Sequence, residues 1–164
     1  MDRGLFKEVP LPCAFLDEVA LDRNIQSIIE LSGNKKIRIA SKSLRSVPIM
    51  QKILATNNRF QGIMCFSPRE ILFLIEQGFN DLLLGYPAYT ERALYEISLL
   101  TKKGFIITCM VDCEEHIVYL ENIAEQSKGC FRVCLDIDMS SRFFQFHFGV
   151  QRSPVKNEIG RAHV

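Results

Sequence analysis

The chain has 164 residues, of which 48% are hydrophobic, and this is enough for one domain with a substantial core. The formal net charge is +1 with no basic cluster, which argues against nucleic acid as the main partner. The apolar runs are short and interrupted by charges, and the N-terminus lacks the apolar stretch of a signal peptide. We therefore expect a cytoplasmic protein with no membrane partner.

Strand and helix patterns alternate along the chain with a spacing of roughly 22–26 residues. A short extended segment is predicted at Pro12–Leu16, followed by a helix over Glu18–Leu31, where apolar residues recur at helical spacing. A strand over Lys36–Ser41 and a helix near Val47–Thr56 come next.

The strand predicted over Gly62–Phe66 runs into Ser67-Pro68-Arg69-Glu70, which has the N-cap serine, N1 proline and capping-box glutamate of a helix start. That helix is expected to end at Gly78. The remaining predicted elements are strand Asp81–Gly85, helix Glu91–Lys103, strand Phe105–Val111, helix Glu114–Gln126 and strand Phe131–Asp136.

Strands that alternate with helices, with no hairpin turn signal between them, indicate parallel pairing through right-handed crossovers. No Gly-x-Gly-x-x-Gly and no Walker-type loop follows any strand, which disfavours a nucleotide-binding sheet. The sequence therefore predicts an α/β fold: a partial (β/α)8 TIM-type barrel with about five of its eight parallel strands.

The cysteines lie inside or beside predicted strands, where a free thiol behaves as a small hydrophobe. Residues four apart on a strand are too distant from each other to share one metal ion. We expect core packing, with no disulfide and no metal site in this chain. The residues concerned are Cys13, Cys65, Cys109, Cys113, Cys130 and Cys134.

Lys42 comes at the end of the first predicted barrel strand. The carboxyl ends of parallel strands form the mouth of such a barrel, where partial desolvation leaves some lysine in the neutral form that a Schiff base needs. The alternative is a solvated lysine that opens a loop.

Strand alternation predicts that Arg38 and Lys42 share the barrel interior with Asp136 and Asp138 of the last strand. An unpaired buried charge is costly, so we expect Arg38 to pair with Asp136 or Asp138. A structural ion pair and a binding role both remain open for Arg38.

Other polar residues also fall near strand ends. Tyr86 precedes a proline and could stack on a planar cofactor or plug the top of the barrel. His147 and Arg152 follow the last strand on a loop predicted to enter the mouth, although a histidine between phenylalanines also fits simple packing. Ser67 is expected to be only an N-cap, and His116 is expected on a helix surface without a role.

Several segments resemble the alanine racemase N-terminal-domain superfamily, the fold-type III enzymes that use pyridoxal phosphate. The resemblance is greatest to the amino-acid deaminase/aldolase group, near D-threonine aldolase and D-serine dehydratase, and it covers about Pro10 to Lys156. The similar segments are Pro12–Asp17, Leu21–Ile25, Ile37–Ser43, Ser67–Glu70, Asp81–Pro87, Leu135–Ser140 and Phe148–Pro154.

The resemblance implies that Lys42 forms the Schiff base with pyridoxal phosphate. It makes Arg38, Tyr86, Asp138 and His147 further candidates for cofactor binding, together with Arg152. Racemases carry an arginine at the place of His147, with Arg142 and Arg152 the nearby substitutes here, and this departure points away from a racemase.

The resemblance also implies a full-length protein of well over twice this length, so residues 1–157 would be the N-terminal part of a cofactor-binding barrel domain. The cofactor-phosphate loops and a C-terminal β-domain, which in the relatives supplies divalent-metal ligands, would lie outside the chain. A homodimer is expected at full length, with a small amino acid as substrate.

The expected function is that of a pyridoxal-phosphate-dependent lyase (an aldolase or dehydratase) or racemase that acts on a D- or β-hydroxy amino acid; the fragment alone should be inactive. The alternative is a non-catalytic pyridoxal-phosphate-binding homeostasis protein on the same barrel. A strand at Pro12–Asp17 would favour the enzyme, because in two-domain members it belongs with the β-domain.

The last residues, Glu158–Val164, match the translation of a common sequencing-library adapter. We therefore expect the natural sequence to depart near Asn157, and His163 is left out of the functional interpretation.

Overall fold

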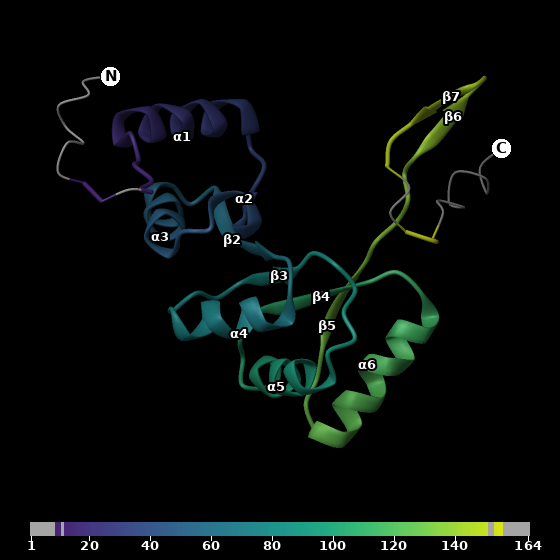
Figure 1. Ribbon diagram of the computed structural model, residues 1–164. Helices are drawn as coiled ribbons and strands as arrows, with labels where there is room; N and C mark the ends of the chain where they lie inside the picture. The colour runs from purple at the N-terminus through teal and green to yellow at the C-terminus, as the bar shows by residue number, and fades with distance from the viewer. Residues whose placement is uncertain (1–8, 11, 151–152, 156–164) are drawn as a thin grey trace. The chain divides into compact units, whose positions relative to one another are not determined.

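The structure, a computed structural model, describes residues 9–10, 12–150 and 153–155 (Figure 1). The chain divides into two compact units, residues 1–36 and 37–164. The first unit contains helix α1 (Glu18–Ser32), whose N-cap Asp17 accepts a hydrogen bond from the Ala20 amide at 2.9 Å. The segment 12–17 forms no strand, so the predicted opening strand is wrong.

The second unit is built on a parallel sheet whose five strands pair in chain order. The strands are β1 (Ile37–Ala40), β2 (Phe60–Cys65), β3 (Leu82–Leu84), β4 (Ile107–Val111) and β5 (Arg132–Leu135). The helices between them are α2 (Ser41–Leu44), α3 (Val47–Thr56), α4 (Pro68–Glu76), α5 (Glu91–Lys102) and α6 (Glu114–Ser127). This is the arrangement of a partial TIM-type barrel and confirms the predicted fold class.

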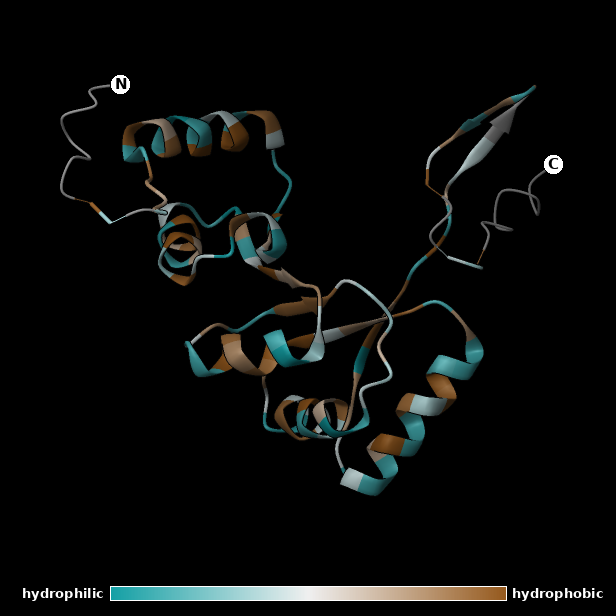
Figure 2. Ribbon diagram, viewed as in Figure 1, coloured by the Kyte–Doolittle hydropathy of each residue, from teal (hydrophilic) through white to brown (hydrophobic). Residues whose placement is uncertain are grey.

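The core lies between the sheet and helices α3, α4 and α5, and α6 packs against α5 (Figure 1). Figure 2 shows hydrophobic strands and helices whose hydrophobic and hydrophilic residues alternate along their length. Burying each leucine or isoleucine side chain contributes about 1.5–3 kcal/mol relative to leaving it exposed. The fully buried side chains include Ile63, Leu82, Leu84, Ile107, Ile71, Leu74, Leu94 and Ile97.

The predicted start of α4 is confirmed, although the Glu70 side chain bonds to the residue before the N-cap rather than to the N-cap amide of a capping box. The Ser67 hydroxyl accepts a hydrogen bond from the Glu70 amide at 3.3 Å, and the Glu70 carboxylate accepts one from the Phe66 amide at 2.8 Å. Both polar side chains at this strand end are therefore used to start the helix. Ser67 is an N-cap, as expected.

Arg38 joins the first and third strands, and its partner is not the one that strand alternation predicts. Its guanidinium donates to the Asp81 carboxylate and to the Asp81 carbonyl oxygen, each at 2.7 Å. The expected pairing with Asp136 or Asp138 is wrong, because Asp81 reaches Arg38 across the intervening strand β2. This approach is possible because Gly62 of β2 has no side chain at that point.

The segment after β5 forms a hairpin where the sequence predicted only a loop. Strands β6 (Ser141–Phe143) and β7 (Phe146–Phe148) pair antiparallel, and Phe144 in the turn has a φ of 54°. Two-residue hairpin turns usually have asparagine, aspartate or glycine at such positions, so this turn gave no sequence signal.

Hydrogen bonds join the segment that leads into this hairpin to the segment that follows it. The Ser153 hydroxyl donates to the Asp136 carbonyl oxygen at 2.7 Å, and the Asp138 amide donates to the Val155 carbonyl oxygen at 2.7 Å. On β5 itself, Val133 and Leu135 are each 51% exposed. None of the described helices is long and apolar enough to cross a bilayer.

We predict that Gly62→Ala destabilises the fold more than Gly78→Ala. Both glycines have positive φ, 62° and 84°, which costs an alanine about 1–2 kcal/mol. At Gly62 the new Cβ would also meet the Asp81 carbonyl oxygen and the Arg38 guanidinium, which adds about 1–3 kcal/mol of overpacking. Around Gly78 nothing lies within 4 Å. Urea unfolding monitored by circular dichroism measures both free energies; equal losses would contradict the crowding at Gly62.

Candidate functional site

Parallel pairing brings the ends of β1, β2 and β3 to one edge of the sheet. Ala40 pairs with Met64, and Cys65 pairs with Leu84, so the residues that follow the three strands emerge beside one another. The carboxyl edge of parallel strands is where α/β barrels place their sites. Lys42 and Tyr86 are two long side chains that emerge there.

Lys42 lies in the single turn of α2 rather than in the strand. The strand ends at Ala40, and the buried Ser41 hydroxyl donates to the Met64 carbonyl oxygen of β2 at 3.1 Å. This bond anchors the chain where it changes direction and leaves the next side chain, Lys42, exposed. Because Lys42 is exposed, the described residues do not provide the partial desolvation of its amine that the sequence predicts at the barrel mouth.

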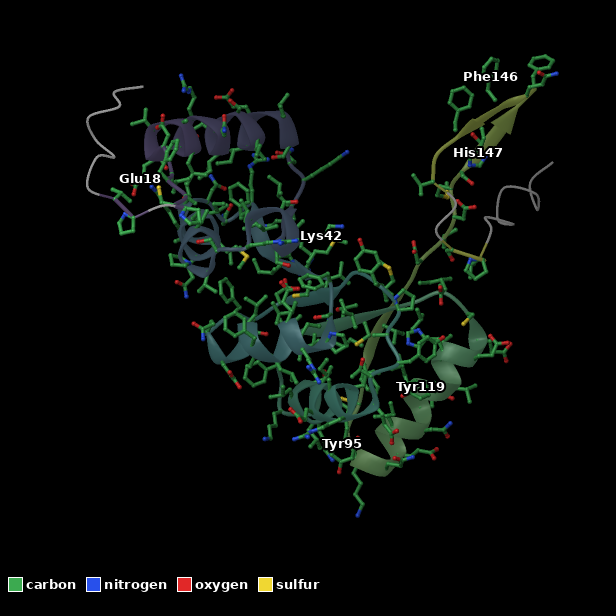
Figure 3. All side chains as sticks on the ribbon, in the orientation of Figure 1. Glu18, Lys42, Tyr95, Tyr119, Phe146 and His147 are labelled. Atoms are coloured by element: carbon green, nitrogen blue, oxygen red, sulfur yellow. The ribbon has the colours of Figure 1, made fainter. Side chains whose placement is uncertain are left out.

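The Lys42 amine contacts Tyr86, the residue two positions after β3 ends. Nζ donates to the Tyr86 hydroxyl at 3.3 Å and lies 5.7 Å from the centroid of its ring. An ammonium within about 6 Å of an aromatic face is attracted to the ring. Within the described residues no carboxylate forms an ion pair with Lys42, which is labelled in Figure 3. The edge thus presents a primary amine beside a phenol.

The other residues predicted for the site have different surroundings. Arg38 uses both terminal nitrogens on Asp81. Asp138 is 8% exposed, and its carboxylate accepts the Ser140 amide at 2.9 Å and the Ser140 hydroxyl at 2.8 Å. None of the hydrogen bonds among described residues joins Arg38 or Asp138 to Lys42.

His147 is exposed on β7, opposite Arg142 in the hairpin register (Figure 3). The expected loop at this point is therefore a strand. Arg152 lies outside the described residues, as does the segment Glu158–Val164. Roles in cofactor binding for Asp138, His147 and Arg152 stay predictions.

His116 is buried, so its predicted place on a helix surface is wrong. It is 1% exposed, and its Nε2 lies 2.9 Å from the Ala88 carbonyl oxygen in the loop that follows Tyr86. The available signal was the helical spacing of His116 with Leu120 and Ile123, which places all three on the buried face of α6.

The cysteines divide into buried and exposed groups. Burial raises the pKa of the Cys65 and Cys109 thiols from 9.0 to about 12, and it also raises the pKa of Cys134. Cys13 and Cys130 are exposed, so the expectation of core packing holds for only part of the set. All six thiols are free.

Comparison with known proteins identifies the fold. No protein-family model and no curated protein sequence matches the chain. Among solved structures, D-threonine aldolase from Filomicrobium marinum matches with a TM-score of 0.75 and 19% identity, over 90% of this chain and 37% of the aldolase. D-threo-3-hydroxyaspartate dehydratase from Delftia sp. HT23 matches with a TM-score of 0.69 and 21% identity, over 83% of this chain and 36% of the dehydratase.

A mutant of D-threo-3-hydroxyaspartate dehydratase gives a third match, with a TM-score of 0.66 and 21% identity, over 78% of this chain and 33% of that protein. The chain therefore spans little more than a third of the length of the structures it matches. At these identities the likeness establishes the fold alone. The resemblance to the D-threonine aldolase group is confirmed at that level.

We predict that alkylation separates the thiols by burial. At mildly alkaline pH, iodoacetamide should label Cys13 and Cys130 in the folded protein, and it should label Cys65 and Cys109 only after unfolding. Because the raised pKa favours the protonated folded state, the buried thiols stabilise the fold below pH 9.0, and this contribution is lost as pH rises towards about 12. Peptide mass mapping checks the labelling; modification of Cys65 as fast as Cys130 would contradict it.

Proposed function

We propose that the full-length protein is a pyridoxal-phosphate-dependent lyase that acts on a D- or β-hydroxy amino acid, with Lys42 as the residue that binds the cofactor aldehyde. The observation that carries this proposal is the Lys42 amine at the carboxyl edge of β1, held 3.3 Å from the Tyr86 hydroxyl. The fold shared with D-threonine aldolase and D-threo-3-hydroxyaspartate dehydratase supports the general class.

The groups at the edge fit such a cofactor chemically. To react with an aldehyde, a primary amine must be accessible and must not be held in its protonated form by an ion pair with a carboxylate. Lys42 meets both conditions within the described residues. A planar ring needs an aromatic neighbour or polar groups at its rim, and Tyr86 offers a ring and a hydroxyl. When bound, pyridoxal phosphate supplies the electron sink for charge that develops at the substrate α-carbon.

In this proposal the residues of the chain bind, orient and transfer protons. Lys42 Nζ would hold the cofactor through its aldehyde group, and the same amine would hold or return a proton near the substrate α-carbon. Tyr86 orients this amine, because its hydroxyl accepts a hydrogen bond from Nζ. Arg38 contributes indirectly: its bonds to Asp81 fix the start of β3 against β1, and these two strands lead into Lys42 and Tyr86.

A non-catalytic pyridoxal-phosphate carrier would use the same lysine and stays the alternative. The argument that a strand at Pro12–Asp17 favours the enzyme has no support, because that segment forms no strand. The preference for the enzyme rests on the shared fold with the aldolase and the dehydratase. Turnover separates the two functions: an aldolase cleaves D-threonine to glycine and acetaldehyde, and a carrier leaves it intact.

We predict that borohydride treatment of the full-length protein with pyridoxal phosphate fixes the cofactor on Lys42. Lys42→Arg should abolish the adduct, because a guanidinium does not form this bond, while it keeps a positive charge at the edge. Lys36→Arg is the matched control, since Lys36 comes just before the opposite end of β1. Peptide mapping by mass spectrometry locates the adduct.

An adduct on Lys36 or Lys52, or its persistence in Lys42→Arg, would refute the assignment of Lys42. A correct adduct without any release of acetaldehyde from D-threonine, or of ammonia from D-serine, would favour the carrier.

A further inference from the structure

The loop that carries Tyr86 is fastened to helix α6. After Tyr86 the chain continues through Pro87 to Ala88 and Tyr89, and each of these last two residues has its carbonyl oxygen bonded to an α6 side chain. His116 Nε2 lies 2.9 Å from the Ala88 oxygen, and the Tyr119 hydroxyl donates to the Tyr89 oxygen at 2.9 Å. His116 and Tyr119 are three residues apart and so lie on the same face of the helix.

His116 acts here as a buried donor. It is 1% exposed, and because a carbonyl oxygen only accepts, Nε2 must carry the hydrogen. Its Nδ1 is buried without a hydrogen-bond partner in the described structure. Burying a polar side chain with one unsatisfied nitrogen costs free energy. The bond from His116 Nε2 to the Ala88 carbonyl oxygen is therefore the hydrogen bond that offsets part of this cost.

The aromatic rings reinforce the same contact. The Tyr89 ring packs against His116 with centroids 4.6 Å apart and against Tyr119 at 5.2 Å. Burial and the negative charge of Glu91 raise the pKa of Tyr119, so its hydroxyl keeps the proton that it donates to the loop. The loop is therefore held by hydrogen bonds to consecutive carbonyl oxygens and by the packing of tilted aromatic rings.

Because Pro87 lies between Tyr86 and the anchored Ala88, it extends the restraint on Ala88 to the backbone of Tyr86. Its ring fixes its own φ, and it restricts the backbone of the preceding residue to extended conformations. Few backbone torsions are then free between the Tyr86 side chain and the anchored Ala88 carbonyl. The other end is fixed by the Gly85 amide, which donates to the Cys65 carbonyl oxygen at 2.9 Å.

We propose that His116 and Tyr119 are positioning residues: by holding the Ala88 and Tyr89 carbonyl oxygens, they keep the Tyr86 hydroxyl on the Lys42 amine. The relevance of this positioning to catalysis rests on the function proposed above for Lys42. The coupling itself, from α6 through the loop to the amine, is a property of the protein without cofactor and is tested in that state.

The test is the rate at which trace acetic anhydride acetylates Lys42 in the full-length protein, relative to Lys52 and Lys36 in the same molecule. The hydrogen bond engages an N–H of Lys42 and restrains its side chain, so Tyr86→Phe should raise the relative rate about twofold to fivefold, as expected for one solvent-exposed polar contact. Tyr119→Phe and His116→Leu should raise it in the same direction, and His116→Gln, which keeps an N–H donor, should restore it at least in part.

The controls separate positioning from general stability. Tyr95→Phe removes an α5 hydroxyl that forms no hydrogen bond within the described residues, and it should leave the rate unchanged (Figure 3). In the Tyr86→Phe background, Tyr119→Phe should add nothing, because the path to Lys42 is already cut. Tyr119→Phe loses only a hydroxyl, so it provides the test if His116→Leu fails to fold.

A Lys42 rate that responds to Tyr86→Phe but not to Tyr119→Phe or His116→Leu would overturn the inference, as would additive effects in the double variant. No response to Tyr86→Phe would overturn it too, since Tyr86 is the proposed link. Because acetylation needs no cofactor, these outcomes are distinct from failure of the lyase proposal, which would appear as absence of a borohydride-fixed adduct on Lys42.

Discussion

The parallel pairing of β1, β2 and β3 is the constraint on which the candidate site depends. Strands β1 and β3 both pair with β2, so they run roughly 10 Å apart and point the same way. Their carboxyl ends reach one edge of the sheet, and two long side chains from that edge meet although they are 44 residues apart in sequence. A reversed or shifted strand would separate the amine of Lys42 from the phenol of Tyr86.

A contact near the amino ends of β1 and β3, away from Lys42 and Tyr86, helps to fix the register of these strands. Arg38 bonds to both the side chain and the main chain of Asp81, across the point where Gly62 leaves room. A charge-assisted bond with both partners mostly buried is stronger than a surface ion pair, because solvent screens it less. The ion pair is therefore structural, and it supports the site without belonging to it.

The fold and the site contribute differently to the functional argument. A barrel of parallel strands hosts many unrelated chemistries, so the likeness to an aldolase and a dehydratase establishes the fold, and the reaction has to be argued from the site. The Lys42 amine beside the Tyr86 phenol is more specific, because it identifies Lys42 Nζ as the atom that would react with the proposed cofactor. The anchoring of the Tyr86 loop on α6 extends the site beyond the residues that touch Lys42, and it gives the buried His116 a role.

The sequence by itself determined the order of the elements, the helix over Val47–Thr56, the N-cap at Ser67 and the position of Lys42 just after the first strand of the sheet. These features come from side chains within a few residues of one another, and local spacing encodes them. Only the tertiary structure decided that Arg38 pairs with Asp81, that His116 is buried beneath the Tyr86 loop, and that a hairpin turns at Phe144. The first two depend on which strands and helices pack together, because partners that are distant in sequence are chosen by register and packing rather than by local pattern. The hairpin is local, but a phenylalanine in its turn is not a residue that predicts one.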